Sequence, residues 1–299
     1  MSDHQHGSEL KGKNLFLAII LNIAITIAQL IGGILSGSLA LLSDALHNFS
    51  DVLSLIISYT ANRLAQRERT ERQTFGYRRA EIIATFFNAS TLIAIGLYII
   101  FEAFSRLSSP EPVDTSLVIW LGLLGILVNG GSIFLLRNDA QESMNIKAAY
   151  LHLLGDVLTS VAVVIGGLLM LFWQIYWVDP VISILIAVYL MYASYGLVKD
   201  STAILMQFAP KSLDLEEIVQ TIIAHKQIQN AHHIHLWNLD DNRIHLEAHL
   251  DFTENLSLKE SNAILEILEE ELHEKYDIDH TVFQCEYERK DDKERVEKQ

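Results

Sequence analysis

Two histidine–aspartate pairs with the same spacing stand inside hydrophobic segments of the chain. His47 precedes Asp51 by four residues, and His152 precedes Asp156 by the same interval. On a helix, residues four apart share one face and lie about 6 Å apart along the axis. Titratable groups in hydrocarbon cost about 3 kcal/mol each even on the lenient insertion scale, so they usually face a cavity and carry out a function. Two imidazoles and two carboxylates form an N2O2 ligand set that suits tetrahedral Zn2+.

Asp44 lies one helical turn before His47 and adds a fifth titratable group. Its place near the start of the segment leaves two interpretations open: a further metal ligand, or a residue that caps the helix or guards the entrance to the site. A non-functional interpretation of the pairs is polar contact between helices, but Asn and Ser usually suffice for that role. Four titratable groups in two matched pairs exceed it, and we expect a metal site.

The elements that would position these groups are membrane helices. Half of the chain is hydrophobic, and six apolar segments approach the twenty residues that a membrane helix requires. These segments are 15–35, 39–62, 80–104, 117–136, 146–172 and 178–198. We predict a cytoplasmic tail over residues 1–13 and an all-α, six-helix transmembrane domain over residues 14–208.

Basic residues fix the expected orientation in the membrane. Several arginines lie between the second and third segments, whereas the connections 36–38, 107–116 and 173–177 contain no Lys or Arg. Basic loops usually stay on the cytoplasmic side. We therefore place both termini in the cytoplasm and the protein in the plasma (inner) membrane of a bacterium.

The C-terminal region lacks the long apolar segments of the preceding chain and instead alternates polar and apolar residues. This pattern predicts a small soluble α+β domain over residues 209–290. Its predicted elements are a helix at 213–225, strands at 228–239 and 243–252, a helix at 257–276 and a strand at 281–287. This α-β-β-α-β order is typical of helices packed on one face of a sheet. Residues 291–299 are strongly charged, and we predict a disordered tail.

The charge and cysteine content restrict the partners. From residue 209 onward, 10 Lys and Arg against 22 Asp and Glu leave a net charge of −12. An acidic domain argues against nucleic acid as a partner and suits a surface that handles cations. The single cysteine excludes a disulfide framework and a Cys-rich zinc finger.

Several motifs resemble the cation diffusion facilitator family, over residues 14 to 288. They are SDAxHxxxD in the second segment, YLHLLGDVLTS in the fifth, FGYRRAE before the third, WVDP before the sixth and HxIHLWxL in the C-terminal region. The chain is most similar to the bacterial zinc, cobalt and cadmium efflux branch. This resemblance implies a homodimeric metal/proton antiporter with a ferredoxin-like cytoplasmic domain. It also implies that His47, Asp51, His152 and Asp156 form the transport site, and that a His at position 47 accompanies zinc preference whereas an Asp there admits cadmium.

The resemblance further implies a cytoplasmic site for Zn2+ with a structural or regulatory role. His232, His249 and Glu286 match the family's ligand positions there. His280 is a candidate for a further ligand, with Asp279 as its competitor.

The ligand chemistry indicates the driving force. His and carboxylate ligands bind metal only when deprotonated, so metal and protons compete for one site, and free His titrates at about pH 6.5. The sequence has no GxxxxGK[ST] phosphate loop, so we do not expect ATP to drive transport. We predict a secondary active exporter of Zn2+ that exchanges it for protons by alternating access, as a homodimer in the lipid bilayer.

Three alternatives remain beside zinc export. The first is a broader exporter of divalent ions such as Cd2+, Co2+ and Ni2+. The second is a membrane metal sensor, which would not require ligands inside the membrane. The third is an enzyme with a hydrolytic zinc, but neither His lies in an HExxH pattern, so we do not expect an enzyme.

Overall fold

The computed structural model describes the backbone of residues 3–65, 67–136, 144–290 and 293–295, together with most of their side chains. The chain divides into two compact units. One comprises Met1–Tyr59 and Phe87–Leu197, and the other comprises Thr60–Phe86 and Val198–Gln299.

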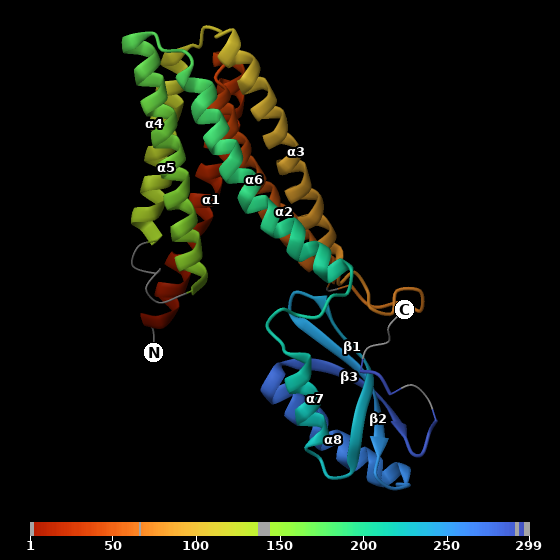
Figure 1. Cartoon of the computed structure of the whole chain (residues 1–299). Helices are drawn as coiled ribbons and strands as arrows, with labels where there is room; N and C mark the ends of the chain where they lie inside the picture. Colours follow the sequence, from red (N-terminus) through yellow and green to blue (C-terminus); the bar gives the residue numbers. More distant parts are fainter. Residues whose placement is uncertain (1–2, 66, 137–143, 291–292, 296–299) are drawn as a thin grey trace. The chain divides into compact units, whose positions relative to one another are not determined.

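Long helices build the first unit (Figure 1). They are α1 (Asp3–Ser36), α2 (Leu39–Ala65), α3 (Ala80–Ser108), α4 (Thr115–Leu136), α5 (Met144–Trp173) and α6 (Val178–Leu205). Within the described residues, α3, α4, α5 and α6 each contain an apolar stretch long enough to cross a membrane, and α1 contributes a shorter one at Ile20–Ser36. Large apolar side chains such as Phe101, Trp120 and Phe134 face outward, as expected where lipid is the solvent. The predicted helical transmembrane architecture is confirmed.

Glycines allow α4 and α5 to pack closely. A Cβ at Gly122 of α4 would lie 2.6 Å from Cγ2 of Val164, and a Cβ at Gly167 of α5 would lie 2.8 Å from Cγ1 of Ile119. Small residues let the backbones of membrane helices approach each other. This contact holds α5, which carries Asp156, against α4.

A carboxylate from α6 caps the N-terminus of α2. Asp179 accepts hydrogen bonds from the backbone N–H of Leu39 at 2.8 Å, the backbone N–H of Ala40 at 3.3 Å and the hydroxyl of Ser38 at 2.5 Å. The first N–H groups of a helix have no partner within the helix, and negative charge is favourable there. Asp179, from the WVDP motif, thereby fixes the start of the helix that carries His47.

The second unit contains the α-β-β-α-β domain that the sequence predicts. Its elements are α7 (Leu215–Ile223), β1 (Ile228–Asp240), β2 (Arg243–Phe252), α8 (Leu258–Tyr276) and β3 (Ile278–Glu286). The sheet has the order β1-β2-β3, in which β2 pairs antiparallel with β1 and parallel with β3. The sheet and its two helices are visible in Figure 1.

The apolar core of this domain lies between one face of the sheet and both helices. Its buried members include Leu246, Ala248 and Leu250 of β2, Ile218 and Ile222 of α7, and Leu268 and Leu272 of α8. Successive strand residues point to opposite faces. The intervening residues of β2, from His245 to Asp251, therefore face away from the helices.

The ends of the domain differ from the prediction in two respects. Strand β3 begins at Ile278 rather than at residue 281, because Asp277 adopts a left-handed conformation (φ 58°) that ends α8 and leads the chain directly into the strand. Residues 293–295, predicted to be disordered, lie against β1, where the carbonyls of Glu294 and Arg295 accept hydrogen bonds from the strand. Residues 291–292 and 296–299 lie outside the described part of the chain.

We predict that Asp179→Ala lowers the melting temperature of the full-length protein in detergent. The substitution removes a charged acceptor from the start of α2, and a hydrogen bond to a charged group contributes about 1.5–3 kcal/mol. Ser38→Ala removes only one of the donors and is the matched control, for which we expect a smaller decrease. An unchanged melting temperature for Asp179→Ala would show that the cap does not stabilise the bundle.

Candidate metal centres

One imidazole lies between two carboxylates in the helical unit. Nδ1 of His47 is 3.6 Å from Oδ2 of Asp51, and Nε2 is 3.4 Å from Oδ1 of Asp156. His47 and Asp51 come from α2, whereas Asp156 comes from α5. One ligand atom from each residue lies within 4.8 Å of the other two, a spacing at which the three can hold a single metal ion. We call these three residues the membrane cluster.

Burial within the membrane cluster is uneven. The side chain of Asp156 is 1% exposed and that of His47 is 11% exposed, whereas that of Asp51 is 35% exposed. The ring of Tyr189 from α6 meets the imidazole of His47 edge to face, with 6.2 Å between centroids. Asp51 therefore marks the open side of the cluster, and Tyr189 limits the orientation of the imidazole.

The other predicted ligand of this site is His152. Its backbone lies in α5, one turn before Asp156, but its side chain lies outside the described part of the structure. The complete N2O2 set therefore stays a prediction.

Asp44 is fully buried and belongs to a hydrogen-bond network instead of the membrane cluster. It accepts hydrogen bonds from the hydroxyl of Thr159 at 2.6 Å, the hydroxyl of Ser160 at 3.1 Å and the side-chain amide of Gln29 at 3.3 Å. A buried charge is tolerated only when polar partners surround it. Asp44 thus joins α1, α2 and α5. Its place inside α2 excludes the cap, whereas a role as ligand or at the entrance to the site stays a prediction.

A glycine of α4 provides the space for this network. A Cβ at Gly125 would lie 2.7 Å from Nε2 of Gln29 and 3.1 Å from Oγ of Ser160. Gln29 in turn accepts a hydrogen bond from the side-chain amide of Asn48 at 3.2 Å. Gln29 was not predicted from the sequence. The two hydroxyl residues at the end of the YLHLLGDVLTS motif, Thr159 and Ser160, were the available sign of a polar network around Asp44.

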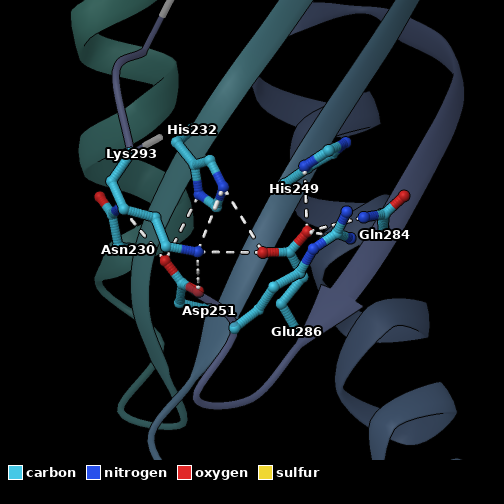
Figure 2. Close-up of polar contacts among 8 residues, drawn as sticks. Asn230, His232, His249, Asp251, Gln284, Glu286 and Lys293 are labelled. Atoms are coloured by element: carbon cyan, nitrogen blue, oxygen red, sulfur yellow. Dashed lines mark hydrogen bonds and ion pairs between the residues drawn. The ribbon is translucent and has the colours of Figure 1, made fainter. Parts of the chain in front are cut away.

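A second cluster lies on the helix-free face of the sheet. His232 of β1 and His249 of β2 are direct cross-strand partners, and the carboxylate of Glu286 on β3 contacts both rings (Figure 2). Its Oε1 is 3.1 Å from Nδ1 of His249, and its Oε2 is 3.5 Å from Nε2 of His232. Ligand atoms of the three residues lie within 4.8 Å of one another. We call them the cytoplasmic cluster.

The surroundings of His249 favour the metal-binding form of its imidazole. Burial lowers the pKa of the His249 imidazole, and the neighbouring carboxylate of Glu286 opposes that shift. A lowered pKa keeps the ring neutral at physiological pH. Neutral imidazole is the form that binds a metal ion.

The register of the sheet separates His280 from this cluster. His280 is the partner of His245, and their ring centroids lie 4.9 Å apart. His245 precedes His249 by four residues on β2, which corresponds to about 13 Å along a strand. The carboxylate of Asp279 accepts a hydrogen bond from the backbone of Ile244 at 2.9 Å. The structure therefore brings neither candidate for the further ligand into the cluster.

Asp251, and not the predicted further ligand His280, lies beside the cytoplasmic cluster. It is the register partner of Glu286, and its Oδ2 lies 3.4 Å from Nδ1 of His232. The sequence could have indicated this, because Asp251 follows His249 by two residues and residues i and i+2 of a strand share one face.

Comparison with known proteins identifies the two regions of the chain that contain these clusters. Residues 15–206 match the model of the cation efflux transmembrane domain, and residues 210–288 match that of the cation efflux protein, cytoplasmic domain. The chain belongs to the cation diffusion facilitator family. The motif-based resemblance is thereby confirmed.

Three relatives illustrate the similarity. The chain is 37% identical over 287 residues to the cadmium, cobalt and zinc/H(+)-K(+) antiporter of Bacillus subtilis, covering 95% of this chain and 92% of that protein. It is 34% identical over 292 residues to the zinc transporter ZitB of Pectobacterium atrosepticum, covering 97% and 90%. It is 33% identical over 284 residues to the metal cation efflux system protein CzcD of Cupriavidus metallidurans, covering 95% and 88%.

Membership of this family defines the general activity. This cation diffusion facilitator is a multi-pass membrane antiporter for the efflux of divalent cations, with a cytoplasmic C-terminal domain, and it is not an enzyme.

We predict that His249→Ala weakens Zn2+ binding to the cytoplasmic cluster by at least about 10- to 100-fold, the range seen when a residue that only supports a metal ligand is lost. His280→Ala is the matched control, and its separation from the cluster predicts an unchanged affinity. The measurement is competition with a chromophoric chelator, using the full-length protein with Asp51→Ala and Asp156→Ala so that the membrane cluster does not contribute. Equal weakening by the two histidine variants would contradict the ligand set.

Proposed function

We propose that this protein exports Zn2+ from the cytoplasm and exchanges it for protons by alternating access. The observation that carries the proposal is the convergence of His47 and Asp51 from α2 with Asp156 from α5. Imidazole nitrogen and carboxylate oxygen are ligands that Zn2+ accepts in tetrahedral sites. A site built between two helices can open to either side of the membrane when the helices shift.

Charge balance in the membrane cluster supports proton coupling. Asp51 and Asp156 carry two negative charges when ionised, and a divalent ion neutralises both. When the metal leaves, protons can take its place, and an imidazolium at His47 pairs with both carboxylates at the observed distances of 3.6 and 3.4 Å. Metal and protons therefore occupy the same groups in turn, which is the requirement for exchange.

A second candidate function is export of Cd2+ and Co2+ beside Zn2+. The observation that favours it is the 37% identity to a relative whose name includes cadmium, cobalt and zinc. The imidazole of His47 favours the narrower specificity, because a nitrogen ligand with a fixed ring suits the compact tetrahedral geometry of zinc.

The cytoplasmic domain supports a proposed homodimer with metal-dependent regulation. Residues 210–288 match the family's cytoplasmic domain, and the region from residue 209 onward has 10 Lys and Arg against 22 Asp and Glu, a net charge of −12. Two such domains repel each other. Zn2+ at the cytoplasmic cluster reduces this repulsion and favours their association, which couples transport to the cytoplasmic zinc concentration.

The direct test of the proposal is zinc-dependent proton movement in proteoliposomes that contain the purified protein. We predict that Asp51→Ala and Asp156→Ala each abolish both zinc flux and proton counterflow, because the cluster has no spare carboxylate. Asp200→Ala is the matched control: its side chain is 64% exposed and pairs with Lys211 at 2.6 Å, so its flux should equal that of the wild type. Normal zinc flux by the Asp156→Ala protein would remove Asp156 from the site.

Selectivity is tested at His47. We predict that His47→Asp raises cadmium transport relative to zinc by about tenfold, which corresponds to ~1.4 kcal/mol. A carboxylate binds through one or two oxygens and tolerates a larger ion than an imidazole does. His47→Asn removes the imidazole without adding charge and is the control, for which we expect loss of both fluxes. An unchanged ratio of zinc to cadmium uptake in the His47→Asp protein would show that His47 does not set selectivity.

A further inference from the structure

A lysine from the C-terminal segment lies within the cytoplasmic cluster (Figure 2). Nζ of Lys293 is 2.8 Å from Oδ1 of Asp251, 3.0 Å from Oε2 of Glu286 and 3.5 Å from Nε2 of His232. The side chain of Lys293 is 34% exposed, whereas those of His232 and Glu286 are 0% and 1% exposed. The ammonium group therefore reaches into the site from the solvent side.

The contacts of the ammonium group define the tautomer of His232. An ammonium can only donate, so Nε2 of His232 accepts and the ring proton lies on Nδ1. Nδ1 faces Oδ2 of Asp251 at 3.4 Å. In metal-bound histidines the ring nitrogen that does not bind the metal commonly faces a carboxylate or carbonyl oxygen. Nζ of Lys293 thus lies where an ion bound by Nε2 of His232 and the carboxylate of Glu286 would lie.

The charges in the site show why metal and lysine exclude each other. The carboxylates of Asp251 and Glu286 carry two negative charges. Lys293 and Arg289 supply two positive charges, with Nη1 of Arg289 2.9 Å from Oε1 of Glu286. A divalent ion supplies the same charge. An ion added beside both cations would leave excess positive charge next to the buried carboxylate of Glu286, which is costly. Displacement of Lys293 relieves this excess, whereas Arg289, whose side chain is 53% exposed, can stay at the solvent.

Backbone hydrogen bonds join residues 294 and 295 to β1. The register of β1 with β2 shifts between His232 and His235, where His233 adopts a left-handed conformation (φ 49°). The N–H groups of His233 and Ile234 donate to the carbonyls of Glu294 and Arg295 at 3.1 and 2.7 Å.

An ion pair between Arg295 and Glu216 of α7 also holds the segment. Such exposed pairs contribute little to stability. The contacts of Lys293 with Asp251 and Glu286 add to this attachment, and their loss would weaken it.

We propose that Lys293 is a tethered cation that occupies the cytoplasmic metal site until a divalent ion displaces it, and that this exchange releases residues 293–295 from β1. The inference rests on the proposed binding of metal at His232, His249 and Glu286 and is independent of transport by the membrane cluster. The tethered ammonium lowers the apparent affinity for metal, because only the fraction of molecules with the lysine displaced can bind. The cytoplasmic cluster then binds zinc only above a threshold concentration, and binding releases residues 293–295.

Zinc affinity tests the competition. The full-length protein with Asp51→Ala and Asp156→Ala is titrated with Zn2+ against a chromophoric chelator, with and without Lys293→Met. We expect Lys293→Met to bind zinc about tenfold more tightly, as removal of an internal competitor requires. Lys290→Met is the matched control: Lys290 is exposed and lies three residues earlier in the chain, and we expect its removal to change affinity by less than about twofold. Equal affinities for Lys293→Met and Lys290→Met would overturn the proposal.

Hydrogen exchange tests the release. In the same background, Zn2+ should accelerate exchange of the amides of His233 and Ile234, because they lose the carbonyls of Glu294 and Arg295. Lys293→Met should show fast exchange at these amides without zinc. Unchanged or slower exchange of these amides on addition of zinc would overturn the release of the segment.

A further variant separates failure of this proposal from failure of the metal site. If His232→Ala combined with His249→Ala leaves zinc binding unchanged, the cytoplasmic cluster is not a metal site and the role of Lys293 falls with it. If that variant abolishes binding while Lys293→Met behaves like the wild type, the metal site stands and the tethered cation alone is overturned.

Discussion

A carboxylate inside a helical bundle must be neutralised or surrounded by donors, and this constraint accounts for the contacts of Asp44, Asp51 and Asp156. Asp44 meets it with donors from α1 and α5, for which Gly125 leaves room. Asp51 and Asp156 meet it with the imidazole that lies between them. The partners of Asp44 are permanent, because its hydroxyl and amide donors are side chains of the protein. The partners of Asp51 and Asp156 can exchange, because protons and a divalent ion can neutralise the same groups. The position of these groups depends on the Asp179 cap of α2 and on the packing of α4 on α5.

The cytoplasmic domain meets the same constraint at Glu286 by another route. Its carboxylate is 1% exposed and contacts two imidazoles, a lysine and an arginine. In the proposed transport cycle the competitor of the metal is a proton, which moves across the bilayer and can drive transport. In the cytoplasmic domain the competitor is an ammonium group fixed to the chain, which cannot drive transport but can set a threshold. One ligand chemistry thus serves two purposes, according to whether the competing cation is free or tethered.

The sequence predicts the helices, the α-β-β-α-β order and the convergence of Asp51 and Asp156 with His47 because these features follow from local periodicity and from the cost of charge in hydrocarbon. It does not predict features that depend on register or on contacts distant in sequence. The position of His280 depends on a parallel pairing of β2 with β3 that places it opposite His245, and no local pattern encodes that offset. The contact of Lys293 with Asp251 likewise arises only when the chain returns to β1. The role of Gln29 depends on the space beside Gly125 of another helix.

The central claim is that metal and protons compete for the groups of the membrane cluster. It is tested most directly by counting the protons released when Zn2+ binds to the purified full-length protein in weakly buffered detergent, with His232→Ala and His249→Ala present to silence the cytoplasmic cluster. Competition requires proton release on binding, an apparent zinc affinity that falls as the pH is lowered, and loss of both signals in Asp156→Ala. Zinc binding at the membrane cluster without proton release, or with an affinity that does not depend on pH, would contradict it.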